Sequence, residues 1–281
     1  MAHKYFLAIA VLSLAAACST AAEPELAIAP FNVASAQLYQ QQCAATLGVP
    51  LEITNSLGIK LVLIPPGRFT MGPNGSTYRV TIRKPFYMDV TEVTLGQYRK
   101  YQADHRVEGA ADEFNEDARP VAMVSWDDAG AFCCWLSEQR EERSAGRTYS
   151  MPSEAQWEWA ARAGTATTRY FGEDDKRQKE FCWFNDTYTP NPKHELDGRG
   201  RRAVAQLSPN SWGLHDMLGN VWEWCGDRHV DERTGESRDP VMRGGSWRSG
   251  AFHCTAVAHD PGDPRQKGDS IGFRVVCTVA K

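Results

Sequence analysis

The sequence predicts an α+β domain in which short helices and strands come early and long irregular loops follow. Three observations support this fold class. Periodic segments lie between residues 51 and 164, a stretch without periodic runs covers residues 165–270, and an alternating strand is expected at 271–279. The 281 residues are 42% hydrophobic and 23% charged, which suits one large globular domain.

Two early segments carry strand signals. Residues 61–64 form an apolar run that Pro65-Pro66-Gly67 closes, which is typical of a buried strand. Residues 78–82 alternate apolar and polar side chains, which predicts a half-buried strand.

Three helices are expected, and each follows a residue that suits an N-cap. The first covers about 95–103 after Thr94. The second runs from 126 to about 143 after Ser125, with Asp128 three residues on. The third begins at Ser153, with Gln156 three residues on, and ends at residue 164.

The irregular stretch at 165–270 is rich in Gly, Pro, Asn and Asp. Such a long loop region is unusual within one domain. Large apolar side chains are expected to pack these loops without regular structure. They are Trp183, Phe184, Trp212, Trp222, Trp224 and Trp247.

The first 18 residues look like a secretory signal. A basic start at Lys4 precedes an apolar run that ends in small residues before Cys18. This resembles a bacterial lipobox, in which Cys18 becomes lipidated; ordinary cleavage at a small-residue site is the alternative. Residues 19–50 are interpreted as a tether with a short helix near 34–47, and residues 51–281 as the domain. The prediction is an exported cell-envelope protein, lipid-anchored or periplasmic.

Charge and cysteine content restrict the function further. A net charge of −4 gives no reason to expect nucleic-acid binding, and beyond the N-terminus no apolar run is long enough to span a membrane. A membrane contact is therefore expected only through a lipid anchor. Without Cys18, seven of the eight cysteines remain. In an exported protein they can form disulfides, and an odd number leaves one thiol free or paired with another molecule.

Six motifs occur in the order of one known family. They cover residues 64–72, 86–94, 120–126, 151–162, 213–224 and 243–249; Cys254 and residues 271–274 follow the last of them. The chain from about residue 51 to 279 thereby resembles the formylglycine-generating enzymes, also called sulfatase-modifying factors. The resemblance implies an irregular fold related to the C-type lectin fold.

The resemblance also implies chemistry. In the oxidase members, two cysteines hold copper and convert the cysteine of a Cys-x-Pro-x-Arg segment to formylglycine. Placed on that pattern, Cys254 is the second copper cysteine and Ser249 stands in the place of the first. Ser246 would orient the substrate cysteine or oxygen, and Trp222 would form an apolar wall. His259 lies where the family often has an arginine-bearing stretch. It is interpreted either as a new ligand or acid–base group, or as a polar loop residue without such a role.

Two functions follow from this site. The first is an oxidoreductase of the cell envelope that oxidises a cysteine in a protein or peptide substrate. The second is a catalytically inactive binding or scaffold lipoprotein with an envelope partner. Cu(I) is soft and prefers thiolates, so the Ser249 hydroxyl is a poor ligand and argues against standard activity. Cys254 is then either a metal and redox thiol or a small buried hydrophobe.

Calcium and disulfides are further implications of the resemblance. Asp216, Gly219, Val221 and Glu223 match a calcium loop of the family, and oxygen ligands suit this hard cation; a surface turn is the alternative. A second family site lies near Asn185 and Asp186. A disulfide between Cys133 and Cys277 would join the second helix to the last strand, as family members can. Cys182 and Cys225 form a further candidate pair.

Overall fold

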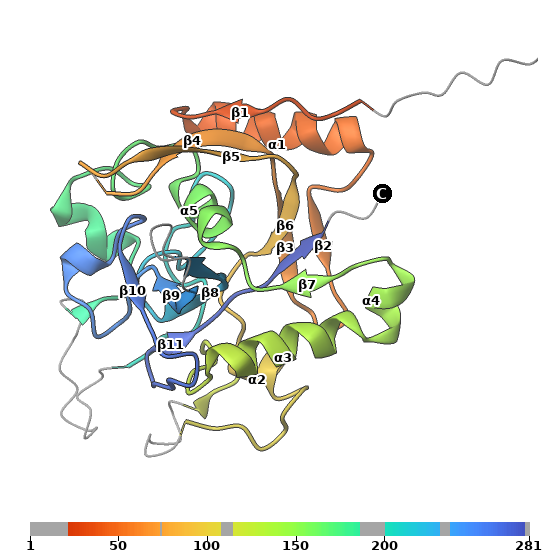
Figure 1. Ribbon diagram of the computed structural model, residues 1–281, viewed down its shortest axis with the longest axis vertical. Coiled ribbons are helices and arrows are strands. Elements are labelled where there is room, and N and C mark those ends of the chain that lie inside the picture. The colour runs from red at the N-terminus through yellow and green to blue at the C-terminus, as the bar shows by residue number, and fades with distance from the viewer. Residues whose placement is uncertain (1–21, 74, 108–114, 186–199, 231–236, 279–281) are drawn as a thin grey trace, which may run out of the picture.

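A computed structural model describes residues 22–73, 75–107, 115–185, 200–230 and 237–278. It is an α+β structure with three sheets and extensive irregular loops, as predicted (Figure 1). In this view α1 (Val33–Leu47) follows one edge of the molecule and α3 (Trp126–Ser137) the opposite edge, with sheets between them. Among the described residues, no helix has the length and apolar character needed to cross a membrane.

The central sheet has five strands in the order β2-β3-β6-β12-β7 and is antiparallel throughout. Both faces of β3 are buried, which explains its continuous apolar run. The C-terminal strand lies between β6 and β7, so the two ends of the domain meet in one sheet. The strands are β2 (Glu52–Thr54), β3 (Lys60–Ile64), β6 (Phe86–Asp89), β7 (Tyr149–Ser150) and β12 (Val276–Thr278).

Two smaller sheets flank this one. The first contains β1 (Ala27–Ile28), β4 (Gly67–Met71) and β5 (Tyr78–Ile82). The second has the order β10-β9-β8-β11, so the stretch expected as loop contains a hairpin. Register shifts in the β8–β9 pair break the alternation that would have indicated it. Its strands are β8 (Trp222–Val230), β9 (Ser237–Arg243), β10 (His259–Pro261) and β11 (Ile271–Gly272).

The predicted helix starts are confirmed by hydrogen bonds. Ser125 and Ser153 each form a capping box, at the start of α3 and of α5 (Glu154–Arg162). The first predicted helix is only α2 (Leu95–Tyr98). The second stops early, because extended Gln139 separates α3 from α4 (Arg140–Ser144).

The interpretation of residues 19–50 as a tether is wrong for the described part of this segment. β1 pairs with β4, and α1 buries Ala36 and Cys43 against the domain. Phe31 packs between Trp159 and Trp212, with ring centroids 6.0 Å from each. The helix near 34–47 is confirmed, and the domain therefore begins before residue 51.

The last predicted strand is divided between two sheets. β11 pairs with β8, whereas β12 pairs with β6 and β7. Between them the Phe273 and Val275 carbonyls accept the Val93 and Asp89 N–H groups. This crossover allows the buried Arg274 side chain to reach Glu223.

Candidate functional site

The site of the family's copper chemistry lies in the loop that follows β9. Gly244 and Gly245 have φ values of +92° and +79°, so the chain turns sharply there. A Cβ atom on Gly245 would lie 2.7 Å from the Cys254 sulfur. Glycine at this position therefore allows the start of the loop to lie directly on Cys254.

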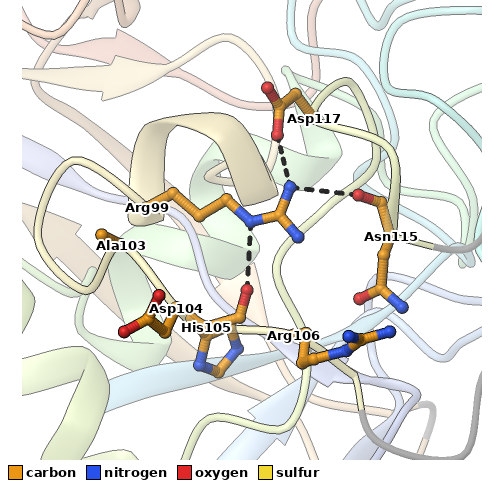
Figure 2. A pocket seen from close by; sticks show the side chains of 7 residues that line it. All are labelled: Arg99, Ala103, Asp104, His105, Arg106, Asn115 and Asp117. Atoms are coloured by element: carbon orange, nitrogen blue, oxygen red, sulfur yellow. Dashed lines mark hydrogen bonds and ion pairs between the residues drawn. The ribbon is translucent and has the colours of Figure 1, made fainter. Parts of the chain in front are cut away.

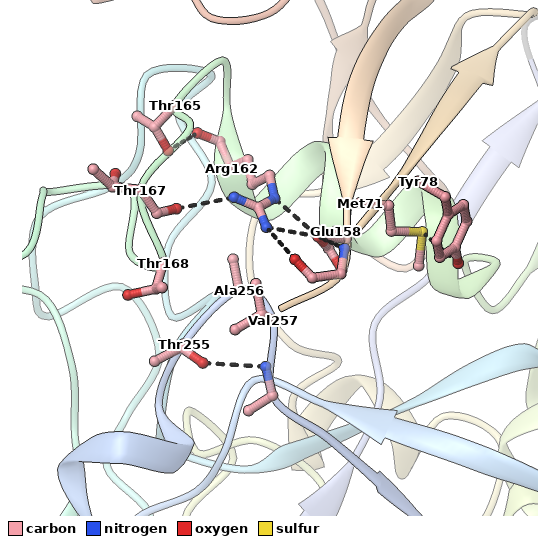
Figure 3. A network of polar contacts seen from close by, with 12 residues as sticks. Met71, Tyr78, Glu158, Arg162, Thr165, Thr167, Thr168, Thr255, Ala256 and Val257 are labelled. Carbon is pink, nitrogen blue, oxygen red and sulfur yellow. Dashed lines mark hydrogen bonds and ion pairs between the residues drawn. The ribbon is translucent and has the colours of Figure 1, made fainter. Parts of the chain in front are cut away.

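Arg243 holds the two arms of this loop together. Its guanidinium donates to the carbonyls of Ala256, Val257 and Ala258 at 2.7–3.0 Å and to the carboxylate of Glu158. Glu158 also accepts a hydrogen bond from Arg162. Figure 3 shows Ala256 and Val257 close to this pair. Arg243 and Glu158 are both buried, so the loop rests on an ion pair shielded from solvent.

The Ser249 hydroxyl closes the turn that carries it. Its oxygen accepts the Ser246 N–H at 3.0 Å and lies 3.2 Å from the Ser246 hydroxyl. Ser246 and Ser249 are both buried, at 1% and 9% exposure. Ser249 is thus a structural part of the turn, and Ser246 is its hydrogen-bonding partner.

Cys254 is fully buried, and another cysteine is its neighbour. Its thiol makes a weak contact of 3.9 Å with the Ser246 carbonyl. Burial, and then the neighbouring Cys254 thiol, raise the pKa of Cys182 well above its usual range. The sequence did not signal this pair, because its members lie far apart in the chain.

Copper does not fit the Ser249–Cys254 pair. A neutral hydroxyl that already bonds its own turn is not a ligand for a soft cation, and Cys254 supplies one thiolate where two are needed. The standard ligand set of the oxidases is therefore incomplete in this protein.

The same loop carries side chains that reach the surface. Arg248, Phe252 and His253 are exposed and Trp247 is half-buried, as is Trp222 in β8. These five residues are here called the aromatic surface. Phe252 is 72% exposed and its ring lies 4.0 Å from that of His253. The Trp222 ring lies 6.4 Å from His253, and Arg248 lies over the Trp247 ring at 4.4 Å. Trp222 is thus part of a surface that solvent reaches, whereas His259 is in β10.

The predicted calcium loop contains two buried carboxylates. Both oxygens of Glu223 accept hydrogen bonds, from Arg274 at 2.6 and 2.7 Å and from the Trp157 indole N–H at 2.7 Å. Asp216 accepts the Ala205 N–H at 2.7 Å. Glu223 is the partner of Arg274 in this structure, and the calcium assignment of Asp216, Gly219, Val221 and Glu223 stays a prediction.

Glu92 is a residue that the sequence reasoning missed. Its side chain is fully buried, and neither of its carboxylate oxygens has a hydrogen-bond partner among the described residues. Burial, and then the nearby Asp216 carboxylate, raise the pKa of Glu92 well above its usual range. The only available signal was an acidic residue within the buried motif at 86–94.

Four buried carboxyl groups lie near the Arg274 guanidinium. The carboxylates of Asp89, Glu92, Asp216 and Glu223 all act on one another or on this guanidinium, and all four are buried. Across the described ranges, no three Asp, Glu, His or Cys side chains converge as a metal site. Hard cations also take main-chain carbonyls and water, so two carboxylates can be enough for calcium.

Other predictions fall elsewhere. Cys18 and Asp186 lie outside the described residues. Asn185 is exposed, and its N–H donates to the Ser249 carbonyl.

The four cysteines of the two predicted disulfides are free thiols in this structure, and the pairings stay predictions. Cys133 interacts with adjacent Cys134, whereas the Cys277 thiol contacts the Thr278 carbonyl at 3.3 Å. Cys182 lies against Cys254 instead of Cys225.

An open pocket of about 650 Å³ lies apart from the loop (Figure 2). None of the predicted site residues lines it. The Arg99 guanidinium at its wall is held by Asp117 and by the carbonyls of His105 and Asn115. It presents no group with evident chemistry.

Comparison with known proteins agrees with this geometry. The Inactive C-alpha-formylglycine-generating enzyme 2 of Bos taurus is 27% identical over 286 residues, covering 80% of this chain and 90% of its own. The Formylglycine-generating enzyme of Mus musculus is 26% identical over 338 residues, covering 93% and 86%. The solved structure of Treponema denticola variable protein 1 has a TM-score of 0.68 and 23% identity, covering 82% and 100%. Residues 52–279 match the Sulfatase-modifying factor enzyme 1-like domain, so this chain belongs to the formylglycine-generating-enzyme-like (FGE-sulfatase) family.

Proposed function

We propose that this protein binds an extended segment of a protein partner without oxidising it. The observation that carries the proposal is the Ser249 hydroxyl, which bonds its own turn at the position of a copper thiolate in the oxidases. The similarity to a relative named as inactive, over most of both chains, supports the same conclusion.

The aromatic surface is the proposed binding site. Its Phe252 is the most exposed of the large hydrophobic side chains described, and a tryptophan ring with a stacked arginine lies in the same loop. Exposed aromatic and arginine side chains are frequent anchors in protein recognition. The exposed Phe252 ring suits an apolar side chain of the bound segment, and the Arg248–Asp269 ion pair adds a polar border to the surface.

We place this function in the cell envelope. The signal-like N-terminus and the lipobox-like residues before Cys18 support export and a lipid anchor. An anchored protein would meet its partner at the membrane surface, so the partner is itself an envelope or exported protein.

The test uses a labelled Cys-x-Pro-x-Arg peptide and the same peptide with serine in place of cysteine. We expect both to bind equally in fluorescence polarisation, because binding does not use the thiol. Mass spectrometry after incubation with copper and oxygen should show no formylglycine. Conversion that is lost in Cys254→Ala would overturn the proposal. It would establish cysteine oxidation, the second candidate, which the retained Cys254 favours.

A variant locates the binding surface. Phe252→Ala should weaken peptide binding about tenfold, as expected for an anchor residue whose truncation costs more than about 1 kcal/mol. Tyr78→Ala is the matched control, because this aromatic residue is 58% exposed on β5. Equal binding by Phe252→Ala and wild type would exclude the aromatic surface as the site.

We also propose that Glu92 and Asp216 hold a calcium ion as part of the folded structure. The unpartnered oxygens of Glu92 and the buried carboxyl groups near Arg274 support this. An isolated carboxylate buried without a partner is strongly unfavourable, and a divalent cation would remove that cost.

A further inference from the structure

We propose that Cys182 and Cys254 form a disulfide bond in an oxidising environment, so that the structure described here is the reduced form. Both cysteines are fully buried free thiols. The Cys182 sulfur lies against Gly219 and the Cys254 sulfur against Gly245. The Gly219 N–H donates to the Gly244 carbonyl at 2.9 Å, so these two stretches of backbone, and the thiols on them, are neighbours. The bond would join the loop before Trp183 to the loop after Ser246.

Two hydrogen bonds join these loops. The Asn185 N–H donates to the Ser249 carbonyl at 3.0 Å, and the Gln178 side-chain amide donates to the Ala251 carbonyl at 3.0 Å. Trp183 also forms a parallel bridge with Gly219. The contact between the sulfurs is therefore supported on both sides by backbone that is already positioned.

Two glycines provide the space that the sulfurs occupy. A Cβ atom on Gly219 would lie 2.7 Å from the Cys182 sulfur, and one on Gly245 would lie 2.7 Å from the Cys254 sulfur. Real Cβ atoms do not approach a neighbouring atom so closely, so a side chain at either position would clash with a sulfur. Glycine at these two positions therefore lets both sulfurs pack directly on the main chain.

A disulfide is neutral, so it leaves no charge at this fully buried position.

The reaction is thiol–disulfide exchange with a disulfide oxidant such as glutathione disulfide. One cysteine loses its proton and attacks the oxidant, forming a mixed disulfide and releasing one thiol. The second cysteine then displaces the remaining oxidant sulfur. The two protein thiols are oxidised, the oxidant disulfide is reduced to two thiols, and both protons end on the released sulfurs. Because both cysteines are buried, the exchange takes place while the chain folds.

Peptide mapping tests the bond directly. The full-length protein is refolded with glutathione disulfide, its free thiols are alkylated under denaturing conditions, and it is digested with trypsin without reduction. We expect peptide 180–193 linked to peptide 249–265, each of which contains one cysteine. Two alkylated peptides, or Cys182 linked to Cys225 or another cysteine, would overturn the proposal. Because this measurement uses the wild-type protein, it does not depend on whether a variant folds.

Thermal melting provides a second measurement. A disulfide between Cys182 and Cys254 would close a long loop of the unfolded chain. The Tm of the oxidised protein should therefore exceed that of the reduced protein by on the order of 10 °C. Cys182→Ser and Cys254→Ser should each abolish the difference, whereas Cys43→Ser, a buried cysteine of α1, should retain it. The bond is independent of the proposed binding function, since peptide binding is measured at the exposed aromatic surface.

Discussion

At the residue scale, the most unusual feature of this molecule is a group of charged side chains that are buried. Arg274 has no exposure to solvent, donates to Glu223 and to the carbonyls of Asp89 and His215, and lies among four carboxylates. Removing one partner from a buried pair leaves a charge without compensation, which costs more than the pair contributes in itself.

Arg274→Met should therefore destabilise the protein by about 3–5 kcal/mol. The methionine fills part of the volume but leaves Glu223 and its neighbours without a cation. Urea unfolding measures the change. Arg265→Met is the control, because Arg265 forms an exposed pair with Asp263, and we expect no resolved change. Equal stability of both variants would contradict the role given to Arg274.

Glu142 gives a prediction about pH. Burial alone would raise its pKa, but hydrogen bonds from Tyr149, Ser56 and Arg147 hold the pKa below the usual value of 4.5. The folded state thus favours the carboxylate. Its stabilising contribution is present above pH 4.5 and is lost as the pH falls through the lower folded pKa.

Glu142→Gln should remove this acid-dependent part of the stability. Unfolding free energies measured between pH 6 and about pH 3 should fall less steeply for the variant than for the wild type. Parallel curves would show that Glu142 has no depressed pKa in the folded protein.

At the scale of the elements, helix starts are set by local hydrogen bonds. The Ser125 hydroxyl accepts the Asp128 N–H at 3.1 Å, and the Asp128 carboxylate accepts the Ser125 N–H at 2.9 Å. These bonds satisfy donors that the helix itself cannot pair. The sequence could therefore predict where α3 begins.

Ser125→Ala should cost about 1 kcal/mol, the usual effect of losing an N-cap side chain. Thermal or urea unfolding measures it. Ser144→Ala, at the exposed end of α4, should leave the stability unchanged, since this side chain caps no helix start. A similar loss in both variants would show a general effect of removing serine.

Where the predictions from sequence were wrong, the reason is that the pairing strands lie far apart in the chain. The alternation of residues 271–279 predicted one strand, but β8 and β6 take its two halves into different sheets. Residues 222–243 showed no alternation because the β8–β9 hairpin is bulged. The motifs were enough to identify the loop around Ser249 and Cys254, whereas Cys182 and Glu92 reach their positions only through tertiary packing.

At the scale of the whole molecule, the two core clusters lie on opposite faces of the five-stranded sheet, since alternate residues of β3, β6 and β12 belong to different clusters. A bound calcium ion at Glu92 and Asp216 would stabilise the folded form by mass action. We expect EDTA to lower Tm of the wild type, and excess calcium to restore it.

Glu92→Gln is the matched variant for this experiment. It removes the carboxylate that has no described partner, so its Tm should no longer respond to EDTA. Glu116→Gln, which affects an exposed carboxylate, should melt like the wild type in both conditions. An unchanged wild-type midpoint in EDTA would contradict a structural ion.

The position of β12 has a consequence for the order in which the central sheet can form. This strand lies between β6 and β7, and among the described residues it is the strand that pairs with β7 in this sheet. β2, β3 and β6 can pair with one another before it arrives. β7 can join them only together with β12, so the last step of sheet formation brings together two segments that are more than a hundred residues apart in the sequence.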